Sequence, residues 1–351
     1  MTSSDRTAGA DAGTGQAVMA AWQTLGPLMD LVTPMALRAA ATLRLADHMP
    51  DDGPDDGAGI ALVDLADRVG ADPDALGRLL RHLVPHGVFT EPRPGRFAAN
   101  ETAALLRTGR PGAVWLDLDG FGGRMDLAFT GLVHTVRTGE PAWEQVFGRP
   151  FWAYLDAEPA MRASFDATMA VDAGSALVAD GYDWTGVRHV ADIGGGTGTL
   201  IAQVLRRDPR LRGTLADLPE TAAGAREYLA GLGVDDRCEV VGQSFFDPLP
   251  AGADVYLLNR VIHDWDDAAA RAILRRCAEA AGSTGRVLIV ESQGTADAAA
   301  CAEMNLRMLV LTGGRERTVD DYTALAADAG LRVTAVHDLA ERRAIIECVP
   351  V

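Results

Sequence analysis

Short apolar runs alternate with amphipathic stretches through the second half of the chain, from residue 186 onward. Strands are predicted near 189–193, 213–217, 238–242, 253–258, 286–291, 333–338 and 343–349. Helices are predicted near 198–207, 220–231, 266–281 and 319–329. Strands that alternate with helices build a parallel sheet with helices on both faces. Ligands of such sheets bind beyond the carboxyl ends of the strands, so we expect the site there.

The first hundred residues show a different pattern, two short helices followed by a hairpin of two short strands, near 87–90 and 96–98. Apolar residues recur at helical spacing in the second of these helices: Leu76, Leu79, Leu80 and Leu83. This order is typical of a winged helix, which either binds DNA or forms dimer contacts. We favour dimer contacts, because the supposed recognition helix has only Arg78, Arg81 and His82 as cations.

The segment between the two halves, 111–180, holds many of the large side chains. They include Trp115, Phe121, Phe129, Trp143, Phe147, Phe151, Trp152, Tyr154, Met161, Phe165 and Met169. Aromatic residues at helical spacing usually form a core, and they also suit the wall of a pocket for a flat organic substrate. The pattern leaves both interpretations open.

Composition narrows the class of protein. The formal net charge of −17 makes nucleic acid and anionic membranes poor partners. Four cysteines without a C-x-x-C pair fit a reduced cytoplasmic protein that has no metal site. No apolar run reaches the roughly 18 residues of a membrane span. Residues 1–15 are small and polar, without the features of a signal peptide, and are expected to form a disordered tail.

The most specific local pattern is the glycine-rich turn Asp192-Ile-Gly-Gly-Gly-Thr-Gly198, which lies between an apolar strand and a helix. Its glycines allow close approach of a ligand, and the following helix directs its positive end toward an anion. Thr199 stands where a dinucleotide fingerprint needs its third glycine. Asp217 ends the next strand and is placed to hold a ribose. The pattern is typical of S-adenosylmethionine (SAM) binding, although a tightly packed turn without a ligand would also use glycines.

His263 is the candidate for proton chemistry, since it follows the fourth strand and precedes a helix. A neutral imidazole with a pKa near 6.5 suits a general base that takes the proton of a phenol. A carboxylate partner would fix its tautomer and stabilise the imidazolium. Glu291 and Glu316 are available for this purpose. A histidine at this place is otherwise a capping or surface residue.

Together these motifs resemble the SAM-dependent O-methyltransferases of the plant caffeic-acid type, specifically the bacterial relatives that tailor aromatic polyketides such as anthracyclines. The glycine turn, His263-Asp-Trp265 and Gly313-Gly-Arg-Glu-Arg-Thr318 occur in that family's order and spacing, as does the early segment 31–45. The resemblance implies a homodimer in the cytoplasm, and an α/β fold with a Rossmann-like, seven-stranded SAM-binding domain. It divides the chain into a tail, 1–15, a mainly helical winged-helix dimerisation domain, 16–108, linking helices that form part of the substrate pocket, 109–180, and the catalytic domain, 181–351.

The resemblance also assigns roles to residues. His263 matches the catalytic base, and Glu291 and Glu316 match the acids that flank it. The residues expected to bind SAM are Arg162, Gly194, Gly195, Gly196, Asp217, Gln243, Ser244, Phe245 and Asn259. The residues expected on the substrate side are Asp264, Met304, Asn305 and Arg307.

Two positions depart from the family's pattern. Relatives usually have Gly-Asp before the aromatic residue that follows the third strand, whereas this chain has Gln243-Ser244 before Phe245. A serine binds the adenine amino group less strongly than a charged acceptor does, which predicts a modest affinity for SAM. Asn305 stands where many relatives have an aspartate.

The function predicted from these residues is SAM-dependent methylation of a phenolic hydroxyl on an aromatic natural product, polyketide-like or anthracycline-like. His263 would remove the hydroxyl proton as the oxygen attacks the methyl group in line. Three alternatives remain at this point: a SAM-binding member of the family with hydroxylation or decarboxylation chemistry, an N- or C-methyltransferase, and a DNA-binding regulator.

Overall fold

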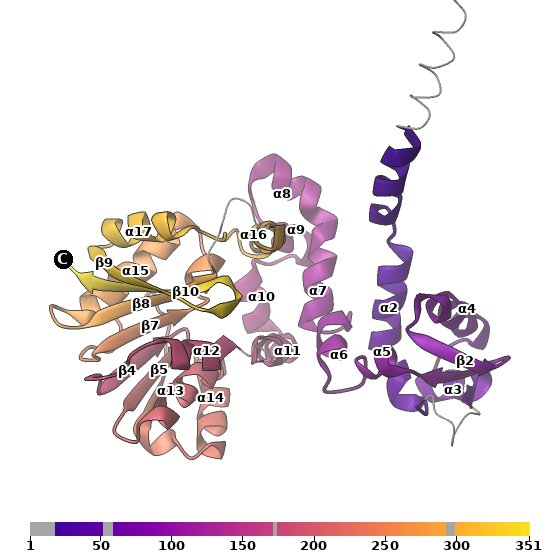
Figure 1. The fold of residues 1–351 in the computed structure, drawn as a ribbon, viewed down its shortest axis with the longest axis horizontal. Helices are drawn as coiled ribbons and strands as arrows, with labels where there is room; N and C mark the ends of the chain where they lie inside the picture. The colour runs from indigo at the N-terminus through magenta and orange to yellow at the C-terminus, as the bar shows by residue number, and fades with distance from the viewer. Residues whose placement is uncertain (1–17, 52–58, 171–173, 293–298) are drawn as a thin grey trace, which may run out of the picture. The chain divides into compact units, whose positions relative to one another are not determined.

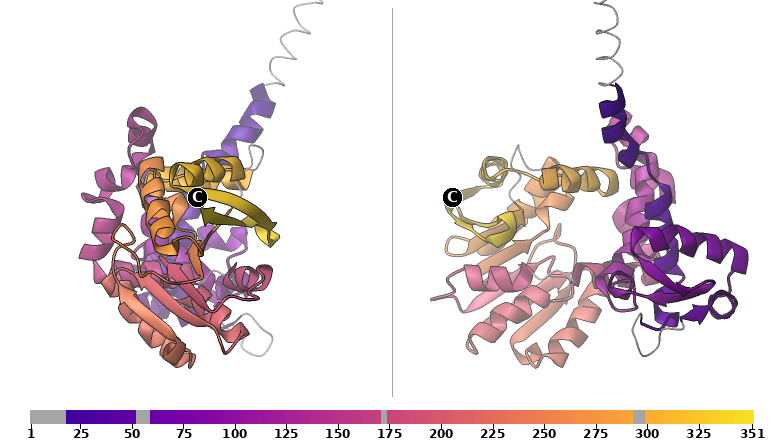
Figure 2. Two further views of the ribbon diagram at one scale, coloured as in Figure 1. Left: turned by 90° about the vertical axis from the view of Figure 1, so that its left-hand side faces the viewer. Right: turned by 45° about the vertical axis from the view of Figure 1, so that its right-hand side comes forward.

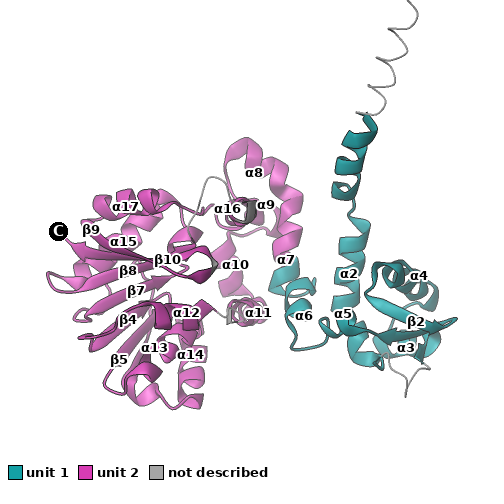
Figure 3. Cartoon of the chain, viewed as in Figure 1, with its two compact units in different colours: residues 1–123 teal, residues 124–351 magenta. Residues whose placement is uncertain are grey.

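The structure, a computed structural model, describes residues 18–51, 59–170, 174–292 and 299–351 (Figure 1). The chain forms two compact units, Met1–Gly123 and Arg124–Val351 (Figure 3). The tail expected at 1–15 lies outside the described residues. Among the residues that are described, no helix is both long enough and apolar enough to cross a membrane.

The first unit contains the predicted helices and hairpin. Its main elements are α2 (Val32–Thr42), α3 (Leu62–Val69), α4 (Pro73–Leu83), β2 (Phe89–Arg93), β3 (Arg96–Ala99), α5 (Glu101–Ala104) and α6 (Pro111–Leu116). Helix α4 begins where the sequence predicts, because the Asp72 carboxylate accepts a hydrogen bond from the Ala75 amide and Pro73 occupies the first turn. Three of the four leucines of the predicted stripe are buried and Leu79 packs partly buried against them.

The sheet of this unit has one strand more than predicted. Its order is β1-β3-β2, and β1 (Ile60–Ala61) pairs antiparallel with β3. A strand of two residues has no alternation of polar and apolar positions for a sequence pattern to reveal. The arrangement of helices followed by a hairpin is that of a winged helix.

The second unit is built on a seven-stranded sheet with the order β6-β5-β4-β7-β8-β10-β9. Its strands are β4 (His189–Ile193), β5 (Arg212–Asp217), β6 (Cys238–Gly242), β7 (Val255–Asn259), β8 (Arg286–Ser292), β9 (Leu331–Asp338) and β10 (Arg343–Pro350). The predicted parallel pairing is correct for β4 to β8 and wrong for β10, which is antiparallel to both its neighbours. Only residues 339–342 separate β9 from β10, too few for the crossover that parallel strands require.

Helices cover both faces of this sheet, as Figures 1 and 2 show. They are α12 (Gly174–Gly181), α13 (Thr199–Arg207), α14 (Pro219–Gly231), α15 (Asp267–Ala281) and α17 (Val319–Asp328). Side chains of α15 and α17 share one core with Tyr256 and Leu258, whereas side chains of α12, α13 and α14 share the other with Val255 and Leu257. Successive residues of β7 therefore point into opposite cores, as strand geometry requires.

The segment before the sheet is helical, as predicted. Its elements are α7 (Phe121–Ala128), α8 (Leu132–Thr138), α9 (Ala142–Phe147), α10 (Phe151–Ala157) and α11 (Pro159–Ala170). A further helix, α16 (Ala299–Leu311), packs on α8 and α9 (Figure 1).

The aromatic residues of this segment include a buried core, and their role as the wall of a substrate pocket stays a prediction. Trp143 is fully buried and packs with Phe147 and Phe151 as a core. Trp152 is only partly buried, and its ring stacks on that of Trp265, with centroids 5.8 Å apart and planes 12° apart. Trp152 is thus the member of the group that reaches the turn containing His263.

Candidate active site

The glycine turn after β4 is shaped for a close approach that other residues could not allow. Gly194 and Gly196 have φ values of 70° and 57°, which side chains other than glycine rarely adopt. A Cβ on Gly194 would lie 2.8 Å from Val261 Cγ2 and 3.5 Å from the Phe245 ring. A Cβ on Gly195 would lie 2.9 Å from the Asp192 carboxyl group. A side chain at Gly194 or Gly195 would therefore collide with other side chains of the protein.

Asp217 closes β5 beside this turn. Its carboxylate oxygens accept hydrogen bonds from the Gly196 amide at 2.8 Å and from the Leu218 amide at 2.7 Å. Burial raises the pKa of Asp217, and the two amides oppose this by stabilising the carboxylate. Each oxygen keeps a lone pair that a ribose hydroxyl could use. The geometry is compatible with the ribose role, which stays a prediction.

A second carboxylate lies behind the turn. Asp192 is buried, and its Oδ2 atom has no hydrogen-bond partner among the described residues. Burial, together with the negative charge of Asp217, raises the pKa of Asp192 to about 7. The negative charge of Asp217 therefore disfavours ionisation of Asp192.

Arg162 is a positive group whose charge acts on Asp217. It is buried in α11, contacts Asp156, and has a buried Nε atom with no partner among the described residues. Its charge lowers the pKa of Asp217. Asp166 lies one helical turn further along α11, and its burial raises its pKa to about 6, against the opposing effect of Arg162. Asp166 was not among the residues predicted from the sequence, although its i, i+4 spacing from Arg162 was a usable signal.

The residues after β6 differ in how many hydrogen bonds their polar side-chain atoms already make within the protein. The Gln243 side-chain amide donates to the Pro248 carbonyl at 3.1 Å. The Ser244 hydroxyl oxygen accepts from the Phe246 amide at 3.2 Å, which leaves its hydrogen to donate. Phe245 packs edge-on against Trp265 at 5.7 Å. Asn259, at the end of β7, has a buried Oδ1 atom without a partner in the described chain.

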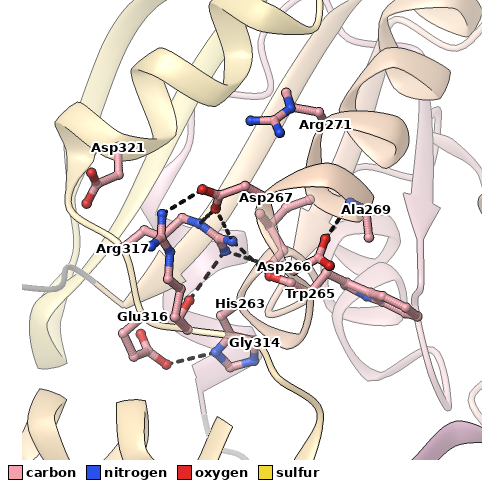
Figure 4. Close-up of polar contacts among 12 residues, drawn as sticks. His263, Trp265, Asp266, Asp267, Ala269, Arg271, Gly314, Glu316, Arg317 and Asp321 are labelled. Carbon is pink, nitrogen blue, oxygen red and sulfur yellow. Dashed lines mark hydrogen bonds and ion pairs between the residues drawn. The ribbon is translucent and has the colours of Figure 1, made fainter. Parts of the chain in front are cut away.

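His263 lies in the short 3-10 turn Ile262–Asp264 and is 6% exposed. Its Nδ1 atom is 2.9 Å from Glu316 Oε1 (Figure 4). The same atom is 3.8 Å from Glu291 Oε2. Its Nε2 atom is 3.5 Å from Asp264 Oδ1. The structure therefore brings together all three predicted catalytic residues and one predicted substrate residue.

Glu291 and Glu316 form hydrogen bonds with different parts of the turn that contains His263. Glu316 bonds the imidazole directly, whereas Glu291 Oε1 accepts the backbone amides of Ile262 at 2.8 Å and His263 at 3.3 Å. Glu316 therefore orients the ring, and Glu291 holds the turn that bears it. A strand-end pattern alone does not separate these roles.

The acids control the ionisation of His263. Burial by itself lowers the pKa of His263, but the negative charges of Glu291, Asp264 and Glu316 outweigh it and raise that pKa to about 9. Burial raises the pKa of Glu291 to about 7 and raises that of Asp264. The cluster thus stabilises a protonated imidazole, which is the state that a base reaches after it has taken a proton.

Helix α16 carries the other predicted substrate residues. Asn305 Oδ1 accepts a hydrogen bond from the Glu316 amide at 3.2 Å, so Asn305 supports the residue that orients His263. Arg307 contacts Asp126 at 3.2 Å and Glu303 at 2.9 Å, which offset its charge. Met304 is partly buried on the same helix. The structure links Asn305 to the acid–base cluster and shows no such link for Arg307 or Met304 among the described contacts.

Comparison with known proteins gives two family matches, one mainly in each unit of the chain. Residues 129–332 match the family model of an O-methyltransferase domain, and residues 28–109 match that of an O-methyltransferase dimerisation domain. The chain is 44% identical to 2,7-dihydroxy-5-methyl-1-naphthoate 7-O-methyltransferase of Streptomyces carzinostaticus, over 90% of this chain and 94% of that protein. It is 46% identical to aclacinomycin 10-hydroxylase RdmB of Streptomyces purpurascens, over 88% of this chain and 83% of that protein.

A solved structure agrees with these sequence matches. It is that of NcsB1, an O-methyltransferase from neocarzinostatin biosynthesis, in complex with S-adenosyl-L-homocysteine and 1,4-dihydroxy-2-naphthoic acid. The TM-score is 0.85 at 43% identity, covering 93% of this chain and 98% of that one. The predicted fold and family are confirmed: this chain belongs to the O-methyltransferases that combine a dimerisation domain with a seven-stranded catalytic domain.

Proposed function

We propose that this protein is a SAM-dependent O-methyltransferase that methylates a phenolic hydroxyl on a fused-ring aromatic natural product. The single observation that supports this most strongly is the buried His263, whose Nδ1 atom is bound to Glu316. That bond leaves Nε2 as the ring nitrogen for a substrate hydroxyl. The relatives that share the fold include enzymes named for naphthoate and phenazine methylation.

The residues at the cofactor end fit SAM. The glycine turn leaves room where a Cβ would collide, and Asp217 offers acceptors for a ribose. The unpartnered Nε of Arg162 can pair with a carboxylate, and Phe245 offers a flat face to a base. When bound, SAM supplies an electrophilic methyl group on a sulfonium. Solved relatives hold SAM or its demethylated product, which agrees with the cofactor predicted for this chain.

The mechanism follows from the cluster. His263 accepts the hydroxyl proton at Nε2, and the Glu316 carboxylate stabilises the imidazolium through Nδ1. Glu291 keeps the turn in place by holding the amides of Ile262 and His263. Most of the rate is expected from holding the substrate oxygen in line with the methyl group, and general-base assistance adds about 10² to 10⁴-fold.

We also propose that the active form is a homodimer in the cytoplasm, joined through the first unit. The match to a dimerisation domain at 28–109 supports this. So do the large apolar side chains that the first unit exposes near its start: Met19, Trp22, Leu28, Met29, Leu31 and Val32.

The test is mass spectrometry of purified protein incubated with SAM and a panel of hydroxylated naphthoic acids and anthracycline-like phenols. We expect a product heavier by one methyl group, together with S-adenosylhomocysteine. His263→Ala should lower kcat by about 10² to 10⁴-fold and leave SAM affinity unchanged. His134→Ala, which changes a histidine that faces Glu140 elsewhere in the unit, is the matched control.

Two results would contradict the proposal. A product that gains oxygen or loses a carboxyl group would favour the hydroxylase chemistry for which RdmB is named. Normal methylation by His263→Ala would remove His263 from the base role.

A further inference from the structure

Arg317 is a completely buried arginine whose guanidinium faces the turn that bears His263. Its Nη1 atom donates to the Ile262 carbonyl at 3.0 Å, and its Nη2 atom donates to the Trp265 carbonyl at 2.8 Å (Figure 4). These carbonyls belong to the residues on either side of His263 and Asp264. One planar group therefore fixes both ends of the catalytic turn.

The charge of Arg317 is balanced at the same place. Asp267, in the first turn of α15, accepts from Arg317 Nε at 3.2 Å and from Nη2 at 2.8 Å. Partial burial would raise the pKa of Asp267, but hydrogen bonding to Arg317 and the charge of Arg315 lower it. Arg317 is thus paired with a carboxylate, which an arginine needs in order to remain buried.

The segment that contains Arg317 contacts the turn at a third point. A Cβ on Gly314 would lie 2.1 Å from the His263 carbonyl oxygen and 2.5 Å from the Asp264 carbonyl carbon. Glu316, which lies between Gly314 and Arg317 in the sequence, forms a hydrogen bond with the imidazole of His263. Residues 314–317 therefore contact the backbone before, at and after His263, and its ring.

The turn needs external support because it makes few bonds of its own. It spans only three residues, and the preceding Arg260 has φ of 55°, a conformation that non-glycine residues rarely adopt. The ring of His263 must nevertheless stay within hydrogen-bond reach of its substrate, since a misplacement of about 1 Å can cost about 100-fold in rate. The fork of Arg317 supplies two fixed bonds, which a lysine could not reproduce.

We infer that Arg317 is a positioning residue that sets the place of His263 by holding the carbonyls of Ile262 and Trp265. The inference rests on the proposed role of His263 as the base. It assigns to Arg317 an effect on catalysis through backbone geometry, with no contact to substrate or cofactor.

The test compares Arg317→Lys with Arg315→Gln in the full-length protein. Lysine keeps the charge and removes the fork, so any change reports geometry. Arg315 bonds the same Asp267 carboxylate at 2.8 Å but is half exposed and makes no described contact with the catalytic turn, which makes it the matched control. The measurements are kcat, KM for SAM and for the acceptor, SAM binding by calorimetry, and kcat against pH.

We expect Arg317→Lys to lower kcat about 10- to 100-fold with SAM affinity unchanged. We also expect the inflection of its pH profile to move to lower pH, because His263 loses its fixed distance from Glu316. Arg315→Gln should match the wild type in both respects. Asp267→Asn, which retains the fork, should fall between the two.

The outcomes separate the inference from the proposed function. If His263→Ala is slow and Arg317→Lys has wild-type kcat and pH profile, the positioning role is overturned and the base role stands. If His263→Ala itself turns over normally, the base role of His263 fails, and the inference that rests on it fails as well. A loss of SAM affinity and thermal stability in proportion to kcat would show a general structural role and overturn the inference.

Discussion

The two ends of the candidate site are built by different means. At the cofactor end, the backbone provides the shape: positive φ angles at Gly194 and Gly196, and main-chain amides bound to Asp217. At the acid–base end, buried side chains provide it: Glu316 on the ring of His263, and Glu291 beneath the turn. At Gly194 an added Cβ would collide with Val261, whereas at Glu316 a change of charge would alter the ionisation of His263.

This contrast predicts that substitutions at the two ends alter different quantities. Glycine substitutions should weaken SAM binding without moving the ionisation of His263. Carboxylate substitutions near His263 should move its ionisation and lower kcat without changing SAM binding. An effect that crosses between the ends would mean that they are coupled, for example through Trp265, which contacts both Phe245 and Trp152.

The largest effect in this comparison is expected from Gly194→Ala. The introduced alanine would have to keep φ near 70°, and its Cβ would lie 2.8 Å from Val261 Cγ2. Strain of about 2 kcal/mol corresponds to roughly a 30-fold rise in the Kd for SAM, measured by calorimetry. Gly224→Ala is the control, since nothing lies within 4 Å of its would-be Cβ. Unchanged SAM affinity in Gly194→Ala would contradict a cofactor role for the turn.

The next effect is expected from Glu316→Gln. His263 acts as a base only when neutral, and its pKa is raised to about 9, so kcat of the wild type should rise with pH and level off above about 9. Removing one negative charge lowers that pKa, so the inflection should move toward neutral pH. The plateau should also fall about tenfold, because the imidazolium loses its charged partner.

Glu303→Gln provides the control for this experiment. Glu303 is an exposed carboxylate on α16 that pairs with Arg307. Removing its charge should therefore leave the inflection of kcat against pH where it is in the wild type. If Glu316→Gln kept the wild-type pH profile, the acids would not govern the ionisation of His263.

The contrast also explains how far the sequence could predict the structure. The glycine turn and Asp217 are local features of consecutive strands, so periodicity and spacing placed them well. The meeting of His263 with Glu291 followed from the rule that parallel strands end at one edge. Glu316 lies in the loop between α16 and α17, and it was named as a candidate from the motif 313–318. Neither argument gives atomic pairing, and so it could not tell that Glu316 holds the ring while Glu291 holds the backbone.

Other contacts between distant segments were not predicted from the sequence. The motif 313–318 was evident, but Arg317 bonds carbonyls 55 and 52 residues earlier in the chain, and Asn305 bonds the Glu316 amide. Such pairs depend on how α16 and the following loop pack, and this packing cannot be predicted from a periodic sequence pattern. The antiparallel direction of β10 follows from the short connection between β9 and β10. The length of this connection can be read from the sequence, but its effect on strand direction follows only once the two strands are known to be neighbours in the sheet.

The smallest effect, and the one that sharpens the cofactor end most finely, is expected from Ser244→Asp. Ser244 Oγ already accepts the Phe246 amide, which leaves mainly a hydroxyl hydrogen to offer an adenine lying on Phe245. A carboxylate could accept that amide and an amino group of the base together. A charged acceptor in place of a neutral one gains about 1 kcal/mol, so the Kd for SAM should fall about fivefold. Ser244→Ala should instead weaken SAM binding slightly, because the Phe246 amide loses its acceptor. Weaker binding of SAM by Ser244→Asp than by the wild type, measured by calorimetry, would mean that the adenine lies elsewhere and that the acids at Asp192 and Asp217 already make this end too negative for another.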